Sequence, residues 1–391
     1  ARLRAGAMAG RAAALAGELE GAWSTRALRI EYGGFLSNHL GQGAVAIARL
    51  GAGAQRAREF AAWYQSARPL EDASAERREE AGRPALVGFA ADLVGRRERF
   101  AALCSYYEGR VRAVGRPGAV AESFGRLSHG LAGSAFHGLI QLGYGYAAGV
   151  DRMVAEGLAY MHFSCQPLAK PGQLHHNPPI AESFEQVASV LRAAVAQAHA
   201  DRKLTDVLEN HVAEFDKLPT SSFQRKMQCL GQYATQDLTA LSVATPTASR
   251  DPGWLVDLAL ALFVDTALDE SVDFFMLHGV TSAWALSQLA PAIRDFPAAQ
   301  VHFVNALLAT YVVQGAPELA PTILTEEEGG SNTEWPAIIE AALDHHRFRE
   351  RDEHVYKLTQ VAWERARDGS ALDEAILKKA AQLVIHRPFR Y

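Results

Sequence analysis

Apolar residues recur every three to four positions along most of this chain, which is the spacing of an amphipathic α-helix. Many of these segments are rich in alanine, the residue with the highest helix propensity. Alternating β-branched residues bounded by turns, the pattern of a half-buried strand, do not occur. The sequence therefore predicts an all-α fold with helices over residues 8–22, 36–50, 60–66, 85–103, 106–114, 119–133, 135–146, 150–159, 180–200, 204–215, 223–233, 255–263, 272–290, 298–314, 335–344, 354–368 and 372–387.

Charged and proline-rich breaks separate these segments, for example at residues 68–84, 164–179 and 316–336. None of the breaks has the composition of a long flexible linker. A chain of 391 residues is long enough to bury a sizeable core. We therefore predict that residues 1–391 form a single large bundle-like domain.

Composition narrows the possible partners. The formal net charge is −5, and the basic residues are scattered rather than gathered in a patch, so nucleic acid is not an expected partner. No apolar run approaches the roughly 20 residues of a membrane span, and residues 1–15 lack the continuous apolar core of a signal peptide. The three cysteines are far apart in the sequence, as expected for reduced thiols. These features favour a cytoplasmic protein that acts on a small molecule. They do not fix the oligomeric state, for which a homodimer is one candidate.

The helix predicted to begin at His354 carries an unusual lysine. His354 and Lys357 stand three residues apart, so their side chains lie on one face of the helix. Leu358 and Val361 share that face, which is therefore the one directed to the core. A buried ammonium ion is costly unless it is paired, deprotonated or chemically changed. Lys357 either extends its charged end to water or belongs to a buried site in an altered state.

Three further histidines, His39, His137 and His278, also stand on apolar predicted helices. A glycine follows His137 and His278 directly, and glycine inside a helix costs about 1 kcal/mol relative to alanine. Its usual compensation is room, either for a close helix crossing or for a group beside the histidine. One such histidine alone is more often a hydrogen-bonded core residue. Four together favour a shared metal site between helices, and imidazole suits iron, zinc, copper or nickel.

The best-known catalytic motifs are absent from the sequence. It contains neither the Glu-x-x-His of di-iron bundles nor the His-Glu-x-x-His of zinc proteases. The glycine-rich phosphate loops and the Gly-x-Ser-x-Gly turn are also missing. Nucleotide binding and acyl-enzyme chemistry therefore have no motif to support them.

In four stretches the chain resembles the questin oxidase-like family: FLSNHL (35–40), FHGLIQLGYG (136–145), FFMLHGVTSAWAL (274–286) and DEHVYKL (352–358). The resemblance implies an all-helical oxygenase that uses O2 to open a ring of an anthraquinone-like aromatic polyketide. It also implies one non-heme iron, Fe(II), held by His39, His137, His278, His354 and Lys357. In such a site the lysine carries a carbamate formed from CO2 on its side-chain nitrogen.

At Gln141 the chain departs from the fungal members of the family, which often carry a second histidine one turn after the position of His137. This difference implies different contacts to the substrate. Besides Lys357, we predict Asn38 and Gln141 as catalytic residues, and the expected pocket walls are Tyr144, His162, Phe275 and Trp284. Two alternatives remain: a Baeyer–Villiger-like monooxygenase with an external reductant, for which a need for NADPH is open, and a non-catalytic helical binding protein with structural histidines.

Overall fold

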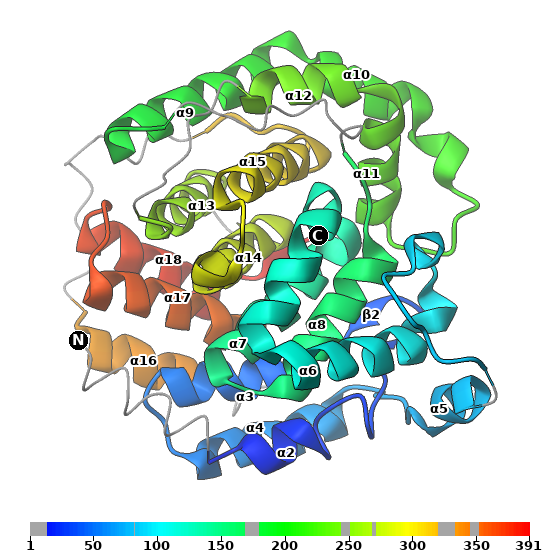
Figure 1. The fold of residues 1–391 in the computed structure, drawn as a ribbon. Coiled ribbons are helices and arrows are strands. Elements are labelled where there is room, and N and C mark those ends of the chain that lie inside the picture. Colours follow the sequence, from blue (N-terminus) through cyan, green and yellow to red (C-terminus); the bar gives the residue numbers. More distant parts are fainter. Residues whose placement is uncertain are drawn as a thin grey trace.

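The computed structural model describes residues 14–81, 83–168, 180–243, 251–267, 271–319, 333–344 and 352–391. Helices dominate these ranges, as predicted (Figure 1). The α-helices are α2 (Ala16–Glu20), α3 (Leu40–Arg49), α4 (Ala54–Ala67), α5 (Ser74–Ala81), α6 (Phe100–Leu127), α7 (His137–Ala148), α8 (Asp151–Ser164), α9 (Phe184–Asp201), α10 (Lys203–His211), α11 (Ser222–Tyr233), α12 (Thr235–Val243), α13 (Gly253–Asp265), α14 (Phe274–Leu289), α15 (Phe296–Val313), α16 (Trp335–Asp344), α17 (His354–Asp368) and α18 (Glu374–His386).

Short elements connect these helices. The 3-10 helices are η1 (Ala91–Leu93), η2 (Arg97–Arg99), η3 (Ser128–Gly130), η4 (Gly133–Phe136), η5 (Val212–Phe215) and η6 (Ala290–Ala292). Within the described ranges, four strands of two residues form two small sheets: β1 (Glu31–Tyr32) pairs antiparallel with β2 (Leu36–Ser37), and β3 (Val272–Asp273) pairs parallel with β4 (Phe389–Arg390). Strands this short do not change the all-α class.

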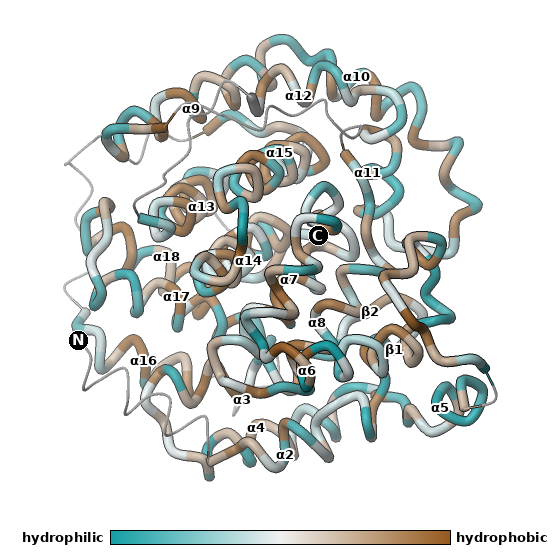
Figure 2. Tube along the Cα trace, viewed as in Figure 1, coloured by the Kyte–Doolittle hydropathy of each residue, from teal (hydrophilic) through white to brown (hydrophobic). Residues whose placement is uncertain are grey.

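The helices surround a central group formed by α7, α8 and α14 (Figure 1). Helix α14 packs against α7, α13, α15 and α17. Helix α3 packs against both α17 and α4. Helices α9, α10 and α12 form an outer layer beyond α15 (Figure 1). The hydropathy of the chain follows this arrangement, because α13, α14 and α15 are largely apolar and the outer helices carry most of the hydrophilic positions (Figure 2). The fold therefore has one continuous core, with α14 near its middle.

Glycines allow the central helices to approach almost backbone to backbone. A Cβ atom on Gly138 would lie 2.6 Å from the backbone nitrogen of Met161 in α8, and one on Gly143 would lie 2.5 Å from the Cα of Ala285 in α14. Larger residues would push α7 away from both neighbours. The glycine after His137 thus serves a close helix crossing, one of the two roles expected from the sequence.

The prediction of a helix over residues 36–50 was wrong at its start. The chain forms a β-hairpin before Leu40, with Gly33 and Gly34 at positive φ angles of 57° and 94° in its turn. Glycine adopts these angles without the steric cost that other residues carry. The Gly-Gly pair between apolar residues was the available signal of a hairpin.

The helix predicted over residues 85–103 begins only at Phe100 in the structure. The residues before it form loops and the short helices η1 and η2, and Gly95 has a φ of +79° that an α-helix does not allow. From Phe100 the helix continues to Leu127 and bends at Gly115, where φ is +72° and Pro117 follows. The separate helices predicted on either side of this position are therefore two arms of α6.

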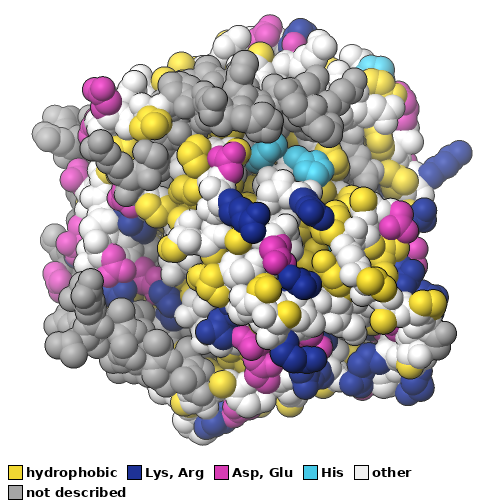
Figure 3. All heavy atoms as spheres, in the orientation of Figure 1, with side chains coloured by type: hydrophobic (Ala, Val, Ile, Leu, Met, Phe, Trp, Pro, Cys, Tyr) yellow, Lys and Arg dark blue, Asp and Glu magenta, His cyan; other side chains and the backbone are white. Residues whose placement is uncertain are grey.

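Helix α15 is long and apolar enough to cross a membrane, but 78% of it is buried inside the fold, as in the core helix of a soluble protein. On the face shown in Figure 3, basic and acidic side chains lie interspersed.

Candidate metal centre

Four histidines from four different helices meet at one point in the core. His39 is the N-cap residue of α3, His137 and His354 are the first residues of α7 and α17, and His278 lies in the second turn of α14. All four side chains are buried, and one nitrogen from each ring lies within 4.8 Å of the corresponding nitrogens of the others. The Nε2 atom of His278 is 3.1 Å from that of His137 and 3.2 Å from that of His354.

Hydrogen bonds orient three of these rings toward the shared point. Nδ1 of His278 lies 2.7 Å from the carbonyl oxygen of Phe274. Nδ1 of His137 bonds the carbonyl of Ser134, and Nδ1 of His354 bonds the carboxylate of Asp352. Because carbonyl and carboxylate oxygens accept, each Nδ1 must be the donor, and the lone pair of the neutral ring is left on Nε2. Such partners are typical of the histidines that bind metals.

The spacing of the Nε2 atoms fits a metal ion. Nitrogen ligands lie about 2.0–2.1 Å from a first-row metal, so two of them at tetrahedral or octahedral angles are about 2.9–3.4 Å apart. The observed separations of 3.1 and 3.2 Å fall in this range. Three lone pairs directed at one buried point repel one another unless a cation lies between them. The histidine cluster is therefore suited to hold a metal ion.

Burial keeps these imidazoles in the form that binds metals. It lowers the pKa of His137 to about 3 and the pKa values of His39, His278 and His354 well below the usual range. The positive charge of Lys357 acts in the same direction on all four. Neutral rings at physiological pH can offer a lone pair without first losing a proton.

Lys357 lies in the same cluster. Its side chain has no exposed surface, and its Nζ atom is 2.5 Å from Nδ1 of His39. The alternative in which its charged end extends to water is therefore wrong. Burial lowers the pKa of this amine to about 7, although the carboxylates of Glu353 and Asp352 act in the opposite direction. A substantial fraction of the amine is thus uncharged near neutral pH, which leaves direct metal binding and carbamate formation open.

The backbone before His137 has an uncommon conformation. Ser134, Ala135 and Phe136 have φ angles of 47°, 52° and 65°, although none of them is glycine. Each such residue costs roughly 1–3 kcal/mol and persists only where its surroundings hold it. Helix α8 supplies that support, because a Cβ atom on Gly133 would lie 1.7 Å from the carbonyl oxygen of Ser164. This run places the carbonyl of Ser134 within reach of the ring of His137.

A cavity of about 400 Å³ lies against the cluster, and His39, His137 and His354 form part of its wall. This size is typical of sites for small organic ligands. The wall also contains Tyr32, Phe35, Leu36, Phe274, Phe275 and Tyr391 as apolar or aromatic residues, and Ser37, Arg68, Arg97, Ser134, Ala135, Thr220, Ser221, Gln224, Asp352 and Glu353 as small, polar or charged ones. Phe275, a predicted wall residue, is thus placed at the cavity.

The structure places two other predicted wall residues elsewhere. Tyr144 and Trp284 pack against each other in the core, with ring centroids 4.5 Å apart. The hydroxyl of Tyr144 donates to Gln360 at 2.7 Å, and Nε1 of Trp284 donates to Glu364 at 2.9 Å. Neither residue lines the cavity. Each stands more than one helical turn beyond the histidine of its own helix, where α7 and α14 run through the core.

Asn38 and His162 also do not line the cavity, although both are buried. The Oδ1 atom of Asn38 accepts from the backbone nitrogen of Leu40 at 3.0 Å, at the start of α3, and its amide donates to the carbonyl of Arg29. His162 bonds the hydroxyl of Tyr107 and the carbonyl of Ala90, each at 2.9 Å. The geometry gives these two residues structural partners rather than a position at the cavity.

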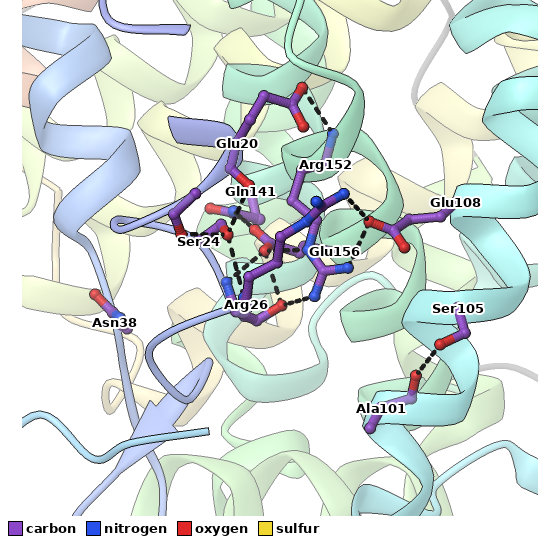
Figure 4. Close-up of polar contacts among 12 residues, drawn as sticks. Glu20, Ser24, Arg26, Asn38, Ala101, Ser105, Glu108, Gln141, Arg152 and Glu156 are labelled. Atoms are coloured by element: carbon purple, nitrogen blue, oxygen red, sulfur yellow. Dashed lines mark hydrogen bonds and ion pairs between the residues drawn. The ribbon is translucent and has the colours of Figure 1, made fainter. Parts of the chain in front are cut away.

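Gln141 belongs to a buried polar network one helical turn beyond His137 on α7. Its amide donates to Glu156 at 2.8 Å and accepts from Gln42 at 3.0 Å, and Glu156 also accepts from Arg152 (Figure 4). A second, larger cavity of about 520 Å³ adjoins this network, between α5 and α6. Its wall contains Arg152 and Glu108, which pair with each other at 2.6 Å. Gln141 therefore lies away from the cavity at the histidine cluster.

Asp352 and Phe274 contact the histidine cluster but were not among the site residues predicted from the sequence. Asp352 bonds the ring of His354, and its position two residues earlier was a usable signal. Phe274 lies against two of the histidines, with centroid distances of 4.6 Å to His278 and 4.7 Å to His354. Its place one turn before His278 on the same helix face could have indicated that contact.

Comparison with protein families gives a match over most of the chain. No curated protein matches the sequence. A family profile described as questin oxidase-like matches residues 36–362, which is most of the 391-residue chain and includes all four histidines and Lys357. The name of the family denotes oxidases, which supports an oxidase or oxygenase function. The chain belongs to the questin oxidase-like family.

Proposed function

We propose that this chain is a non-heme iron oxygenase that uses O2 to open a ring of an anthraquinone-like aromatic polyketide. The observation that carries the proposal is the convergence of four neutral, buried imidazoles and Lys357 beside an aromatic-lined cavity. Family membership supports the broader class of oxidase or oxygenase.

The proposed ligands are His39, His137, His278, His354 and Lys357. The lysine would contribute an anionic oxygen after its amine has added CO2, which requires the unprotonated amine. The pKa of about 7 makes that form available near neutral pH. Iron held here would supply the one-electron chemistry through which O2 reacts with a closed-shell aromatic molecule.

The chain's own residues would position the substrate and keep water away from it. Phe275 is supported from behind by Phe223, whose ring is stacked on it at 4.2 Å with an interplanar angle of 8°. Such a supported ring offers a fixed flat surface to a planar aromatic molecule. Phe274 lies against His278 and His354 and would exclude water from their rings.

Metal content and oxygen uptake test the proposal. Purified protein supplied with Fe(II) under anaerobic conditions should bind about one iron per chain by elemental analysis. The loaded protein should then consume O2 with a hydroxylated anthraquinone and without NADPH. Uptake that begins only after NADPH is added would favour the monooxygenase instead. Protein that binds no metal would refute the proposed centre, and protein that binds iron without oxygen uptake would refute the oxygenase.

A further inference from the structure

One residue in the wall of the cavity at the histidine cluster has a side-chain amide oxygen that bonds to nothing in the fold. Gln224 lies in the first turn of α11, and only 7% of it is exposed. Its backbone nitrogen donates to the hydroxyl of Ser221 at 3.2 Å, but its side-chain Oε1 is buried without a hydrogen-bond partner among the described residues. A buried polar group in this state is costly, so its presence needs an explanation.

Other polar groups of the wall already have partners within the fold. Ser37 and Arg97 are both hydrogen-bonded to buried side chains. Arg68 has a buried Nε atom without a partner, but its charge is paired with Glu353 at 2.8 Å. Among the described wall residues, Oε1 of Gln224 is therefore the buried acceptor that is left for a molecule in the cavity.

Gln224 lies beside the aromatic surface of the cavity. The preceding residue, Phe223, stacks on Phe275, which lies in the wall with its ring centroid 6.1 Å from that of His278. Helix α11 also packs against η4, which directly precedes His137. The first turn of α11 thus supports the flat surface and carries the amide into the wall next to the histidine cluster.

A carboxamide at this position is suited to a hydroxyl group on a planar ring. Its oxygen has two lone pairs, and it stays uncharged at all ordinary pH values. Its last torsion is broad and roughly two-fold, so the amide can turn to meet a ligand at little cost. A ring with a hydroxyl group would complete the hydrogen bonding of the oxygen, whereas a ring without one would displace water and leave the oxygen unpaired.

We propose that Gln224 selects and orients the substrate by accepting a hydrogen bond from a hydroxyl group on its aromatic ring. The inference rests on the proposed function, and it adds that the ring lying against Phe275 carries a hydroxyl on the edge that faces α11. The substrate keeps its proton, and no bond is broken in this role. Because the stacking surface fixes the plane of the ring and Gln224 fixes one edge, the two together determine which part of the ring faces the histidines.

Binding of anthraquinones that differ by one hydroxyl group tests this role. The probes are 1-hydroxyanthraquinone, 2-hydroxyanthraquinone and unsubstituted anthraquinone, titrated into full-length protein with Fe(II) under nitrogen at a pH where the phenols are neutral. Wild type should bind at least one hydroxylated probe about fivefold or more tightly than the unsubstituted one, as expected for one neutral hydrogen bond. Gln224→Met keeps the length of the side chain but has only a weakly accepting sulfur, so its preference should fall below about twofold.

Gln166→Met is the matched control. Gln166 is 8% exposed, and its Oε1 is also buried without a partner among the described residues, but it does not line the cavity. The preference for the hydroxylated probe should therefore be unchanged in this variant. A preference retained in Gln224→Met, or lost in Gln166→Met, would overturn the role of Gln224.

Urea unfolding separates substrate binding from a structural role. Because Gln224→Met removes a buried amide that has no partner, its unfolding midpoint should not lie below that of wild type. A lower midpoint, or a variant that does not fold, would show that the amide supports the fold and would overturn the proposal.

The two proposals fail separately. Equal binding of hydroxylated and unsubstituted probes to wild type would overturn the role of Gln224 alone. Iron-loaded wild type that binds the probes with the expected preference but takes up no O2 would refute the oxygenase and leave the role of Gln224 in binding. Failure of all three anthraquinones to bind would overturn the aromatic cavity of the proposed function, and the role of Gln224 with it.

Discussion

Replacing Lys357 by methionine should stabilise the metal-free protein while removing its metal chemistry. Methionine has nearly the same length and fills irregular core spaces, but it has no ionisable group. Lys357 is fully buried next to His39, so the amine loses its hydration when the chain folds. The substitution therefore isolates the free energy of burying this amine.

The magnitude follows from the pKa of Lys357, which burial lowers from 10.5 to about 7. A shift of one pKa unit corresponds to 1.36 kcal/mol, so the full penalty is about 5 kcal/mol. The unfolded chain binds this proton more tightly than the folded chain does. The penalty on the folded state is therefore complete below pH 7, declines between pH 7 and 10.5, and vanishes above that range. At pH 10 about 1 kcal/mol should remain.

Urea unfolding of metal-free protein in CO2-free buffer measures this difference. Lys357→Met should unfold at higher urea than wild type at pH 7, and the gap should narrow by pH 10. The control Lys203→Met removes an exposed lysine paired with Asp237, a contact that solvent and salt screen. Added metal should reverse the order, because it stabilises only the protein that keeps the full ligand set. A variant less stable than metal-free wild type at pH 7, or a gap that widens at pH 10, would refute the reasoning.

Two further predictions concern the ligands. His278→Ala should lower oxygen uptake by at least about a hundredfold, because altering even the partners of metal ligands costs 10- to 100-fold. Its far-UV circular dichroism spectrum should stay helical. Near-normal oxygen uptake would show that His278 is a core residue only. Lys357→Ala should lose activity and regain part of it with added formate or acetate, whereas Lys357→Arg should stay inactive because guanidinium cannot be carboxylated; an active Lys357→Arg protein would contradict a carbamate.

The sequence was sufficient for the fold class, because the helical period and the alanine content agree along the chain. It also indicated Lys357, since its helix has only one apolar face and the lysine stands on it. The positions of Tyr144 and Trp284 could not be predicted in this way. Their helices are apolar nearly all round, so a helical wheel shows that both residues are buried but not whether they face the cavity or the core.

The contact between Ser37 and Tyr160 was beyond sequence reasoning for a different reason. Ser37 and Tyr160 are 123 residues apart, and they meet only because the Gly33–Gly34 turn brings β2 against α8. The sequence around neither residue indicates that the two side chains meet. The hairpin was predicted as the start of a helix, which would have turned the Ser37 side chain in another direction.

Three of the four histidines stand where helices begin, and this placement has an electrostatic consequence for what the centre will bind. The N-terminus of an α-helix carries roughly half a positive elementary charge. The N-termini of α3, α7 and α17 all lie at the cluster. Together they raise the electrostatic potential at a point shielded from water. Such a point favours small anions over neutral molecules of the same size. Azide, cyanide and formate should therefore bind at the centre in preference to neutral molecules of the same size. A negatively charged ligand group on Lys357 would be stabilised by the same three helix N-termini.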